Sequence, residues 1–133
     1  VPLCGQTELS WEENLLIFPV KKTGCTVHWA GSENSSGSTA LHSQGEEIYF
    51  EYGEHTPERA EHLAKIFAAS SGYTLVKNAG LASHAGFKDW TTQALGIPSF
   101  TFELGKGENP LPPSDLESVY KSIEETLVLA CVM

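Results

Sequence analysis

The chain has 133 residues, of which 41% are hydrophobic and 19% are charged, and its formal net charge is −9 at pH 7. This composition is typical of a globular protein and excludes a disordered one, and the length suffices for one domain with a buried core. The negative charge argues against nucleic acids and anionic membrane surfaces as partners.

The cysteines and the apolar runs bear on the compartment. The chain has an odd number of cysteines, Cys4, Cys25 and Cys131, and no two of them are spaced as a CxxC pair. This pattern excludes a disulfide framework and a zinc ribbon. No apolar run reaches the length of a membrane span, and the first residues lack the basic and apolar regions of a signal peptide. We therefore expect a cytoplasmic chain with reduced thiols and no membrane partner; a Cys4–Cys25 disulfide is the alternative.

The first part of the chain follows no clear pattern. Residues 15–20 and 26–30 are predicted to be short strands, and Pro19 favours an edge position for the first of them. A loop or linker of small polar residues follows. We expect an irregular N-terminal segment over residues 1–38 and an α/β domain over residues 39–133.

From residue 39 onward, strand-like and helix-like segments alternate. Strands are predicted at residues 39–41, 47–52, 73–76 and 99–104, and helices are predicted from residue 56 to 72, from 87 to 96 and from 114 onward. This order is typical of an α/β fold, so we expect a mostly parallel or mixed sheet flanked by helices.

Local signals predict the helix ends. Thr56-Pro57-Glu58 predicts a helix start with Thr56 as the capping residue, and Ser71-Gly72 predicts the end of that helix. Ser114-Asp115-Leu116-Glu117 is a capping box before the last helix. The expected apolar face of the last helix consists of Leu116, Val119, Tyr120, Ile123 and Leu127.

Glu103 is the first candidate site residue. Phe100 and Phe102 alternate onto one face of a predicted strand, which leaves Thr101 and Glu103 on the other face. Two glycines, an Asn and a Pro follow within a short distance, so Glu103 lies at the carboxyl end of the strand, where ligands bind in open α/β sheets. Partial desolvation there would raise its pKa and suit it to general base catalysis; the alternative is a carboxylate that points to water.

Two histidines are further candidates. His42 ends an apolar strand before a turn, on the same sheet edge as Glu103 if the two strands are parallel. A neutral imidazole there can bind zinc, and a carboxylate across the cleft can activate zinc-bound water; the alternative is a histidine satisfied by backbone groups. His84 lies in a loop of small residues that could bring it onto a substrate, or it is simply solvated.

Three motifs occur in order along the chain: Leu41-His42-Ser43-Gln44-Gly45-Glu46, Gly86-Phe87-Lys88-Asp89-Trp90 and Phe100-Thr101-Phe102-Glu103-Leu104-Gly105-Lys106-Gly107-Glu108-Asn109-Pro110. Together they resemble the C-terminal half of the zinc carboxypeptidases, most closely the bacterial γ-D-glutamyl-L-diamino acid endopeptidases, which cut peptidoglycan stem peptides. The resemblance implies zinc as cofactor, His42 as the ligand distant in sequence from the first two, and Glu103 as the base that takes a proton from zinc-bound water. It also implies a peptide substrate, such as a peptidoglycan stem peptide, with His84 as the candidate for the substrate-capping residue.

The upstream part of the family pattern has no match. In these enzymes the first two ligands come from an H-x-x-E motif before the third, and none of the residues before His42 forms one. We therefore expect a chain that is truncated or rearranged at its N-terminus, with weak zinc affinity and weak or no activity alone. The alternatives are a non-catalytic peptide-binding module and a related zinc deacylase on the same fold. Exposed sheet surface would also favour a homo-oligomer.

Overall fold

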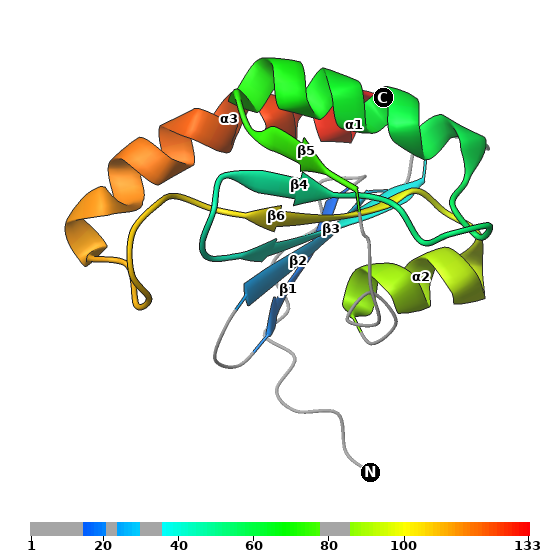
Figure 1. The fold of residues 1–133 in the computed structure, drawn as a ribbon, viewed down its shortest axis with the longest axis horizontal. Coiled ribbons are helices and arrows are strands. Elements are labelled where there is room, and N and C mark those ends of the chain that lie inside the picture. The colour runs from blue at the N-terminus through cyan, green and yellow to red at the C-terminus, as the bar shows by residue number, and fades with distance from the viewer. Residues whose placement is uncertain (1–14, 21–23, 30–35, 78–85) are drawn as a thin grey trace, which may run out of the picture.

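The computed structural model describes residues 15–20, 24–29, 36–77 and 86–133, and the first two ranges are described by their backbone alone. The strands are β1 (Leu15–Val20), β2 (Gly24–Trp29), β3 (Gly37–His42), β4 (Glu47–Tyr49), β5 (Thr74–Val76) and β6 (Ser99–Glu103). The helices are α1 (Glu58–Ser71), α2 (Phe87–Leu95) and α3 (Leu116–Val132), with a short 3-10 helix, η2 (Pro113–Asp115), before α3. Helices α1 and α3 cover one face of the sheet, and α2 lies against the other (Figure 1).

The described strands form one mixed sheet in the order β1-β2-β3-β6-β4-β5. β3 is parallel to β6 and β4 is parallel to β5, whereas β4 runs antiparallel to β6, and β1, β2 and β3 are antiparallel neighbours. The expected α/β fold with a mixed sheet flanked by helices is confirmed, and Pro19 lies on an edge strand as predicted. β1 and β2 belong to the same sheet as the later strands. The division between residues 1–38 and 39–133 stays a prediction.

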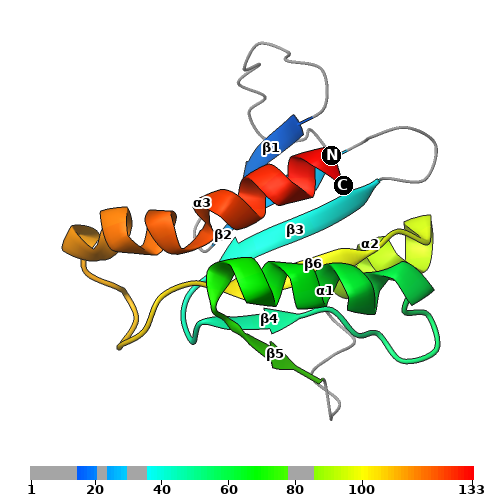
Figure 2. The same cartoon turned by 90° about the horizontal axis from the view of Figure 1, so that it is seen from above.

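Apolar side chains on one face of the sheet pack against α1 and α3 (Figure 2). Phe100 and Phe102 of β6 are almost fully buried, and their ring centroids lie 5.0 and 6.0 Å from that of Phe67 in α1. Aromatic rings at such separations attract each other beyond the effect of burial. Ile48 of β4 and Ile123 of α3 belong to the same core. The predicted alternation along β6 is therefore confirmed.

The predicted cap of α1 is wrong, but its predicted end is confirmed. The Thr56 hydroxyl accepts a hydrogen bond from the backbone N–H of Tyr52 at 2.6 Å, and α1 begins at Glu58 without a side-chain cap. Thr56 therefore closes the turn before the helix. At the other end, Gly72 has a φ of 75°, and its N–H donates to the Ala68 carbonyl.

The start of α3 also differs from the prediction. Ser114 donates to the neighbouring Asp115 carboxylate at 3.0 Å and does not cap α3. Leu116 and Tyr120 are 73% and 51% exposed, and the first turns of α3 extend past the ends of the strands (Figure 1). The buried face of α3 is made by Ile123, Thr126 and Ala130. None of the helices in the described ranges is long and apolar enough to cross a membrane.

Candidate functional site

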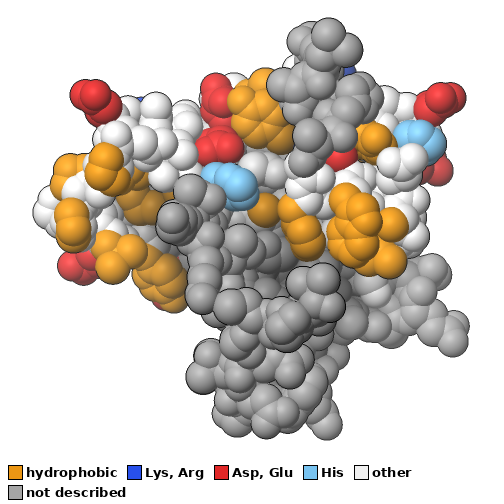
Figure 3. Space-filling view, turned by 90° about the horizontal axis from the view of Figure 1, so that it is seen from below, with side chains coloured by type: hydrophobic (Ala, Val, Ile, Leu, Met, Phe, Trp, Pro, Cys, Tyr) orange, Lys and Arg blue, Asp and Glu red, His pale blue; other side chains and the backbone are white. Residues whose placement is uncertain are grey.

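The face of the sheet that is turned away from α1 and α3 carries a row of polar side chains. Glu103 of β6 is the register partner of His42 in β3 and also of Glu47 in β4. Residues directly opposite each other in neighbouring strands project from the same face. The three side chains therefore lie side by side across three strands, and a histidine next to acidic side chains is visible near the middle of this face (Figure 3).

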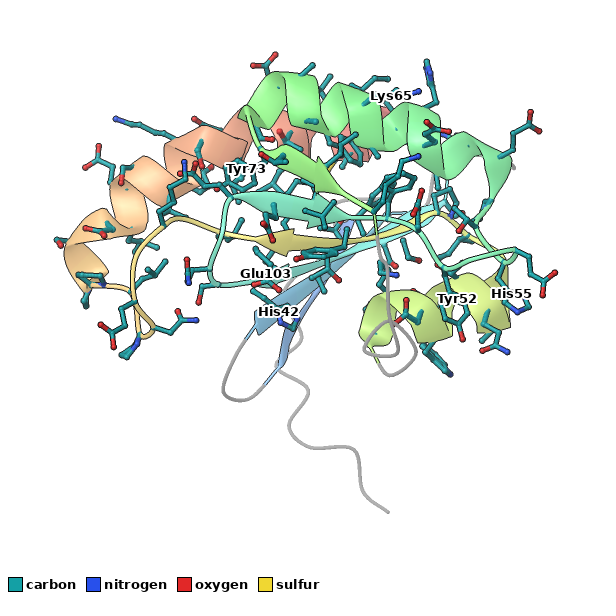
Figure 4. The ribbon with its side chains drawn as sticks, in the orientation of Figure 1. His42, Tyr52, His55, Lys65, Tyr73 and Glu103 are labelled. Atoms are coloured by element: carbon teal, nitrogen blue, oxygen red, sulfur yellow. The ribbon has the colours of Figure 1, made fainter. Side chains whose placement is uncertain are left out.

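His42 and Glu103 meet because two parallel strands end together. His42 is the last residue of β3 and Glu103 is the last residue of β6. Neighbouring strands lie about 4.8 Å apart, which puts the two side chains within each other's reach. Both side chains are on the underside of the sheet in Figure 4. The expectation that they share one sheet edge is confirmed, and the roles assigned to them stay predictions.

The surroundings of Glu103 favour its protonated form. Glu103 is partly buried, and the loss of hydration raises the pKa of its carboxyl group above the ordinary value. The negative charge of Glu47 raises this pKa further, whereas the charge of His42 opposes the rise. A carboxylate that holds a proton more strongly than usual is a better general base.

Glu47 and Tyr49 extend the site, and the sequence analysis did not single them out. The Tyr49 hydroxyl donates a hydrogen bond to the Glu47 carboxylate at 2.6 Å. This bond, burial and the charges of Glu47 and Glu103 raise the pKa of Tyr49 to about 12. The i, i+2 spacing in a predicted strand already indicated that the two residues share a face. The missing information was that β4 lies beside β6, which no local signal predicts.

Helix α2 packs on the opposite end of the same face. The hydroxyl of Ser99, the first residue of β6, lies 2.8 Å from that of Ser38 in β3 and 2.7 Å from that of Thr91 in α2. All three residues are buried. Because Ser38 and Ser99 lie at the starts of their strands, α2 covers the strand starts, while His42 at the carboxyl ends is exposed.

The G-F-K-D-W motif at the start of α2 has a structural role. The buried ammonium group of Lys88 contacts the Asp89 carboxylate and donates to the Glu51 carbonyl at 2.7 Å. The Asp89 carboxylate also accepts from the backbone N–H of Gly86 at 3.2 Å. The pair therefore joins the start of α2 to the segment after β4.

The structure does not test the role predicted for His84 or the predicted zinc ion. His84 lies outside the described residues, so its role stays a prediction. Within residues 36–77 and 86–133, no group of three or more His, Cys, Asp or Glu residues is arranged to hold a metal ion. Among the described residues, His42 therefore has no set of companions that could complete the three-ligand site of a catalytic zinc ion.

Comparisons with known proteins support a relationship over part of the chain. No family model matches it. Over 90 residues it is 38% identical to γ-D-glutamyl-L-diamino acid endopeptidase 1 of Lysinibacillus sphaericus, a match that covers 68% of this chain and 22% of that protein. Over 83 residues it is 40% identical to the uncharacterized protein YqgT of Bacillus subtilis strain 168, covering 62% of this chain and 22% of that protein. The chain is thus partly homologous to an endopeptidase and spans about a fifth of the length of the curated relatives it matches.

Proposed function

We propose that this chain carries the proton-transfer part of a hydrolase site that acts on a cell-wall peptide, at a γ-D-glutamyl bond to an L-diamino acid. The observation that carries the proposal is the register pair of His42 and Glu103 at the carboxyl ends of two parallel strands. The partial homology to an endopeptidase whose name contains the γ-D-glutamyl-L-diamino acid unit supports this bond as the one that is cleaved.

Glu103 is the base in this proposal. Its raised pKa lets it take a proton from the water that attacks the scissile carbonyl carbon. The water oxygen then forms the new bond to carbon, and the protonated Glu103 passes the proton to the leaving amine as the carbon–nitrogen bond breaks. Its position at a rigid strand end keeps the carboxylate in one place through both transfers.

Zinc, as implied by the resemblance to zinc carboxypeptidases, does not fit the described residues by themselves. A catalytic zinc site has three protein ligands, and the described residues place His42 in no group of three or more potential metal ligands. A zinc ion at His42 therefore needs ligands from residues beyond the described ranges. The proton transfers proposed above therefore involve only water, the substrate and Glu103. The role of His42 as a zinc ligand stays part of the proposal.

A non-catalytic peptide-binding module is the second candidate. The absence of a metal-ligand group among the described residues favours it, because a binding module keeps the polar face without needing the metal. The two candidates differ in what the Glu103 carboxylate does. A hydrolase needs it as a proton acceptor, whereas a binding module needs at most its charge or its shape.

The test is a long incubation of the chain at high concentration, with zinc present, with a peptide that contains a γ-D-glutamyl bond to an L-diamino acid. Mass spectrometry detects the two cleavage products, and NMR shift changes at His42 and Glu103 report binding. We expect slow cleavage by the wild-type chain, much slower cleavage by Glu103→Gln, and binding by both. The control is Glu108→Gln, which changes an exposed glutamate in the loop after β6.

Three results would contradict the hydrolase proposal. The first is binding without any cleavage by the wild-type chain, which identifies the binding module instead. The second is cleavage that Glu103→Gln leaves unchanged, because the base would then be another group. The third is the absence of both binding and cleavage.

A further inference from the structure

We propose that Ser43 and Asn109 are a pair of positioning residues that hold His42 opposite Glu103. Ser43 directly follows His42 at the end of β3, and Asn109 lies in the loop that follows Glu103 at the end of β6. Neither side chain belongs to the proposed reaction. Any effect of Ser43 and Asn109 on a reaction rate depends on the proposed function. Their effect on the geometry of His42 and Glu103 does not depend on it.

The two residues form a reciprocal pair of hydrogen bonds. The Ser43 hydroxyl donates to the Asn109 side-chain oxygen at 2.9 Å, and the Asn109 side-chain nitrogen donates to the Ser43 backbone carbonyl at 2.8 Å. Both ends of one planar amide are thus bound to the same residue. Two such bonds fix the orientation of the amide as well as its distance from Ser43.

Further contacts join the same two segments, which we call the β3 turn (residues 42–46) and the β6 loop (residues 104–110). The Leu104 N–H donates to the His42 carbonyl at 2.8 Å, and the Gly45 N–H donates to the Gly105 carbonyl at 2.7 Å. Lys106 and Glu46 form an ion pair at 2.6 Å. Of the contacts that involve side chains, the Ser43–Asn109 pair lies at the residue directly after His42, whereas the ion pair lies at Glu46.

The Ser43–Asn109 pair lies where it can affect the relative position of His42 and Glu103. His42 and Glu103 are the last paired residues of β3 and β6, so their relative position depends on the segments that follow. Strand ends open locally at a lower free energy than core strands. The aromatic core around Phe67 and Phe100 lies on the other face and is held by its own contacts. Loss of the Ser43–Asn109 pair should therefore loosen the site and leave the core intact.

A purely structural role would look different. A general stabiliser changes the melting temperature, and any loosening it causes reaches the core as well. A positioning residue changes the contact between His42 and Glu103 under conditions where the whole chain is folded. If Glu103 is the base, that change also slows the reaction, because a misplacement of about 1 Å can lower a rate by about 100-fold.

The experiment measures nuclear Overhauser effects in the 133-residue chain, without metal or substrate. The first signal connects the His42 ring protons with the Glu103 side-chain protons, and the second connects the rings of Phe67 and Phe100 as a reference for the core. Asn109→Ala removes both hydrogen bonds and Ser43→Ala removes one, whereas Ser43→Thr keeps the hydroxyl. Glu108→Ala, at the exposed position before Asn109, is the matched control.

We expect Asn109→Ala to lose the His42–Glu103 signal while the Phe67–Phe100 signal stays at wild-type intensity. Ser43→Ala should weaken the first signal, and Ser43→Thr and Glu108→Ala should retain it. An unchanged His42–Glu103 signal in Asn109→Ala would overturn the proposal, and so would a parallel loss of both signals. Because no substrate is present, the result does not depend on whether the chain hydrolyses a peptide.

Discussion

Glu47 and Glu103 lie directly opposite each other in the antiparallel strands β4 and β6, so two carboxylates share one face of the sheet. Like charges in directly opposed positions are destabilising. Tyr49 partly compensates by donating a hydrogen bond to Glu47. The pKa of Glu103 is raised, and groups with a shifted pKa gather at functional sites more often than elsewhere. The polar row of His42, Glu103 and Glu47 is therefore the part of the described surface on which the proposed chemistry rests.

Replacement of Glu103 by Gln should stabilise the folded chain at neutral pH. Because the pKa of Glu103 is raised in the folded state, the folded chain binds this proton more tightly than the unfolded chain does. Below the ordinary carboxyl pKa of about 4.3, both states are protonated and the substitution has no effect through this group. As the pH rises through the raised pKa, ionisation destabilises the folded wild type. Urea unfolding at about pH 7 and about pH 4 should show a small gain that is larger at the higher pH.

The control for this prediction is Glu108→Gln, which removes the same charge from an exposed site. The chain has a net charge of −9, so loss of any carboxylate reduces general repulsion. An equal gain in both variants would show that burial of Glu103 is not the cause.

Tyr49 should titrate with a pKa of about 12 because its proton is held between its own oxygen and the Glu47 carboxylate. Glu47→Gln removes the negative charge that the phenolate would face, so the pKa should fall toward the ordinary value of about 10. NMR of the labelled tyrosine ring carbons over alkaline pH measures this, and Tyr49→Phe assigns the signal. A Tyr49 pKa that Glu47→Gln leaves unchanged would contradict the hydrogen bond.

Asp89→Asn should destabilise the chain strongly. The carboxylate of Asp89 and the ammonium group of Lys88 are both buried, and loss of one charge leaves the other uncompensated, at a cost of about 3–5 kcal/mol. The matched control is Glu117→Gln, because Glu117 forms an exposed ion pair with Lys121 within α3. That pair should be worth about 0.5 kcal/mol or less. Chemical unfolding of both variants gives the comparison, and equal costs would contradict the buried pair.

Gly105→Ala should cost more free energy of unfolding than Gly53→Ala. Both glycines have a positive φ, 69° and 51°, where an alanine costs about 1–2 kcal/mol. At Gly105 an added Cβ would also lie 2.9 Å from the Leu111 side chain and 3.0 Å from that of Val119, whereas Gly53 has no atom within 4 Å of this position. Overpacking should add about 1–3 kcal/mol at Gly105. Equal losses in urea unfolding would show that the β6 loop relaxes freely.

The parts of the fold that follow from local patterns were predictable. The alternation of Phe100 to Glu103 predicts which side chains face the core, and the strand ends at His42 and Glu103 predict their shared edge once the strands are parallel. Gly72 and Gly96 end α1 and α2 in left-handed conformations, as their positions in the sequence indicate.

The remaining features depend on contacts between distant segments. Glu47 joins the site only because β4 lies antiparallel to β6, and strand order is not encoded in local periodicity. Thr56 has a side chain that often caps helices, but its hydroxyl oxygen accepts a hydrogen bond from the backbone N–H of Tyr52 in the preceding turn. Leu116 and Tyr120 have helical spacing, but that end of α3 extends beyond the sheet. Periodicity identifies a helix face without showing how far its packing partner extends.

The most direct measurement of the central claim is the rate of γ-D-glutamyl bond cleavage by the wild-type chain and by Glu103→Gln at the same pH. If Glu103 is the general base, the variant should be slower by a factor of about 10² to 10⁴. The acidic limb of the wild-type pH–rate profile should also lie above the ordinary carboxyl pKa, because the pKa of Glu103 is raised. Equal rates for the two chains would contradict the account.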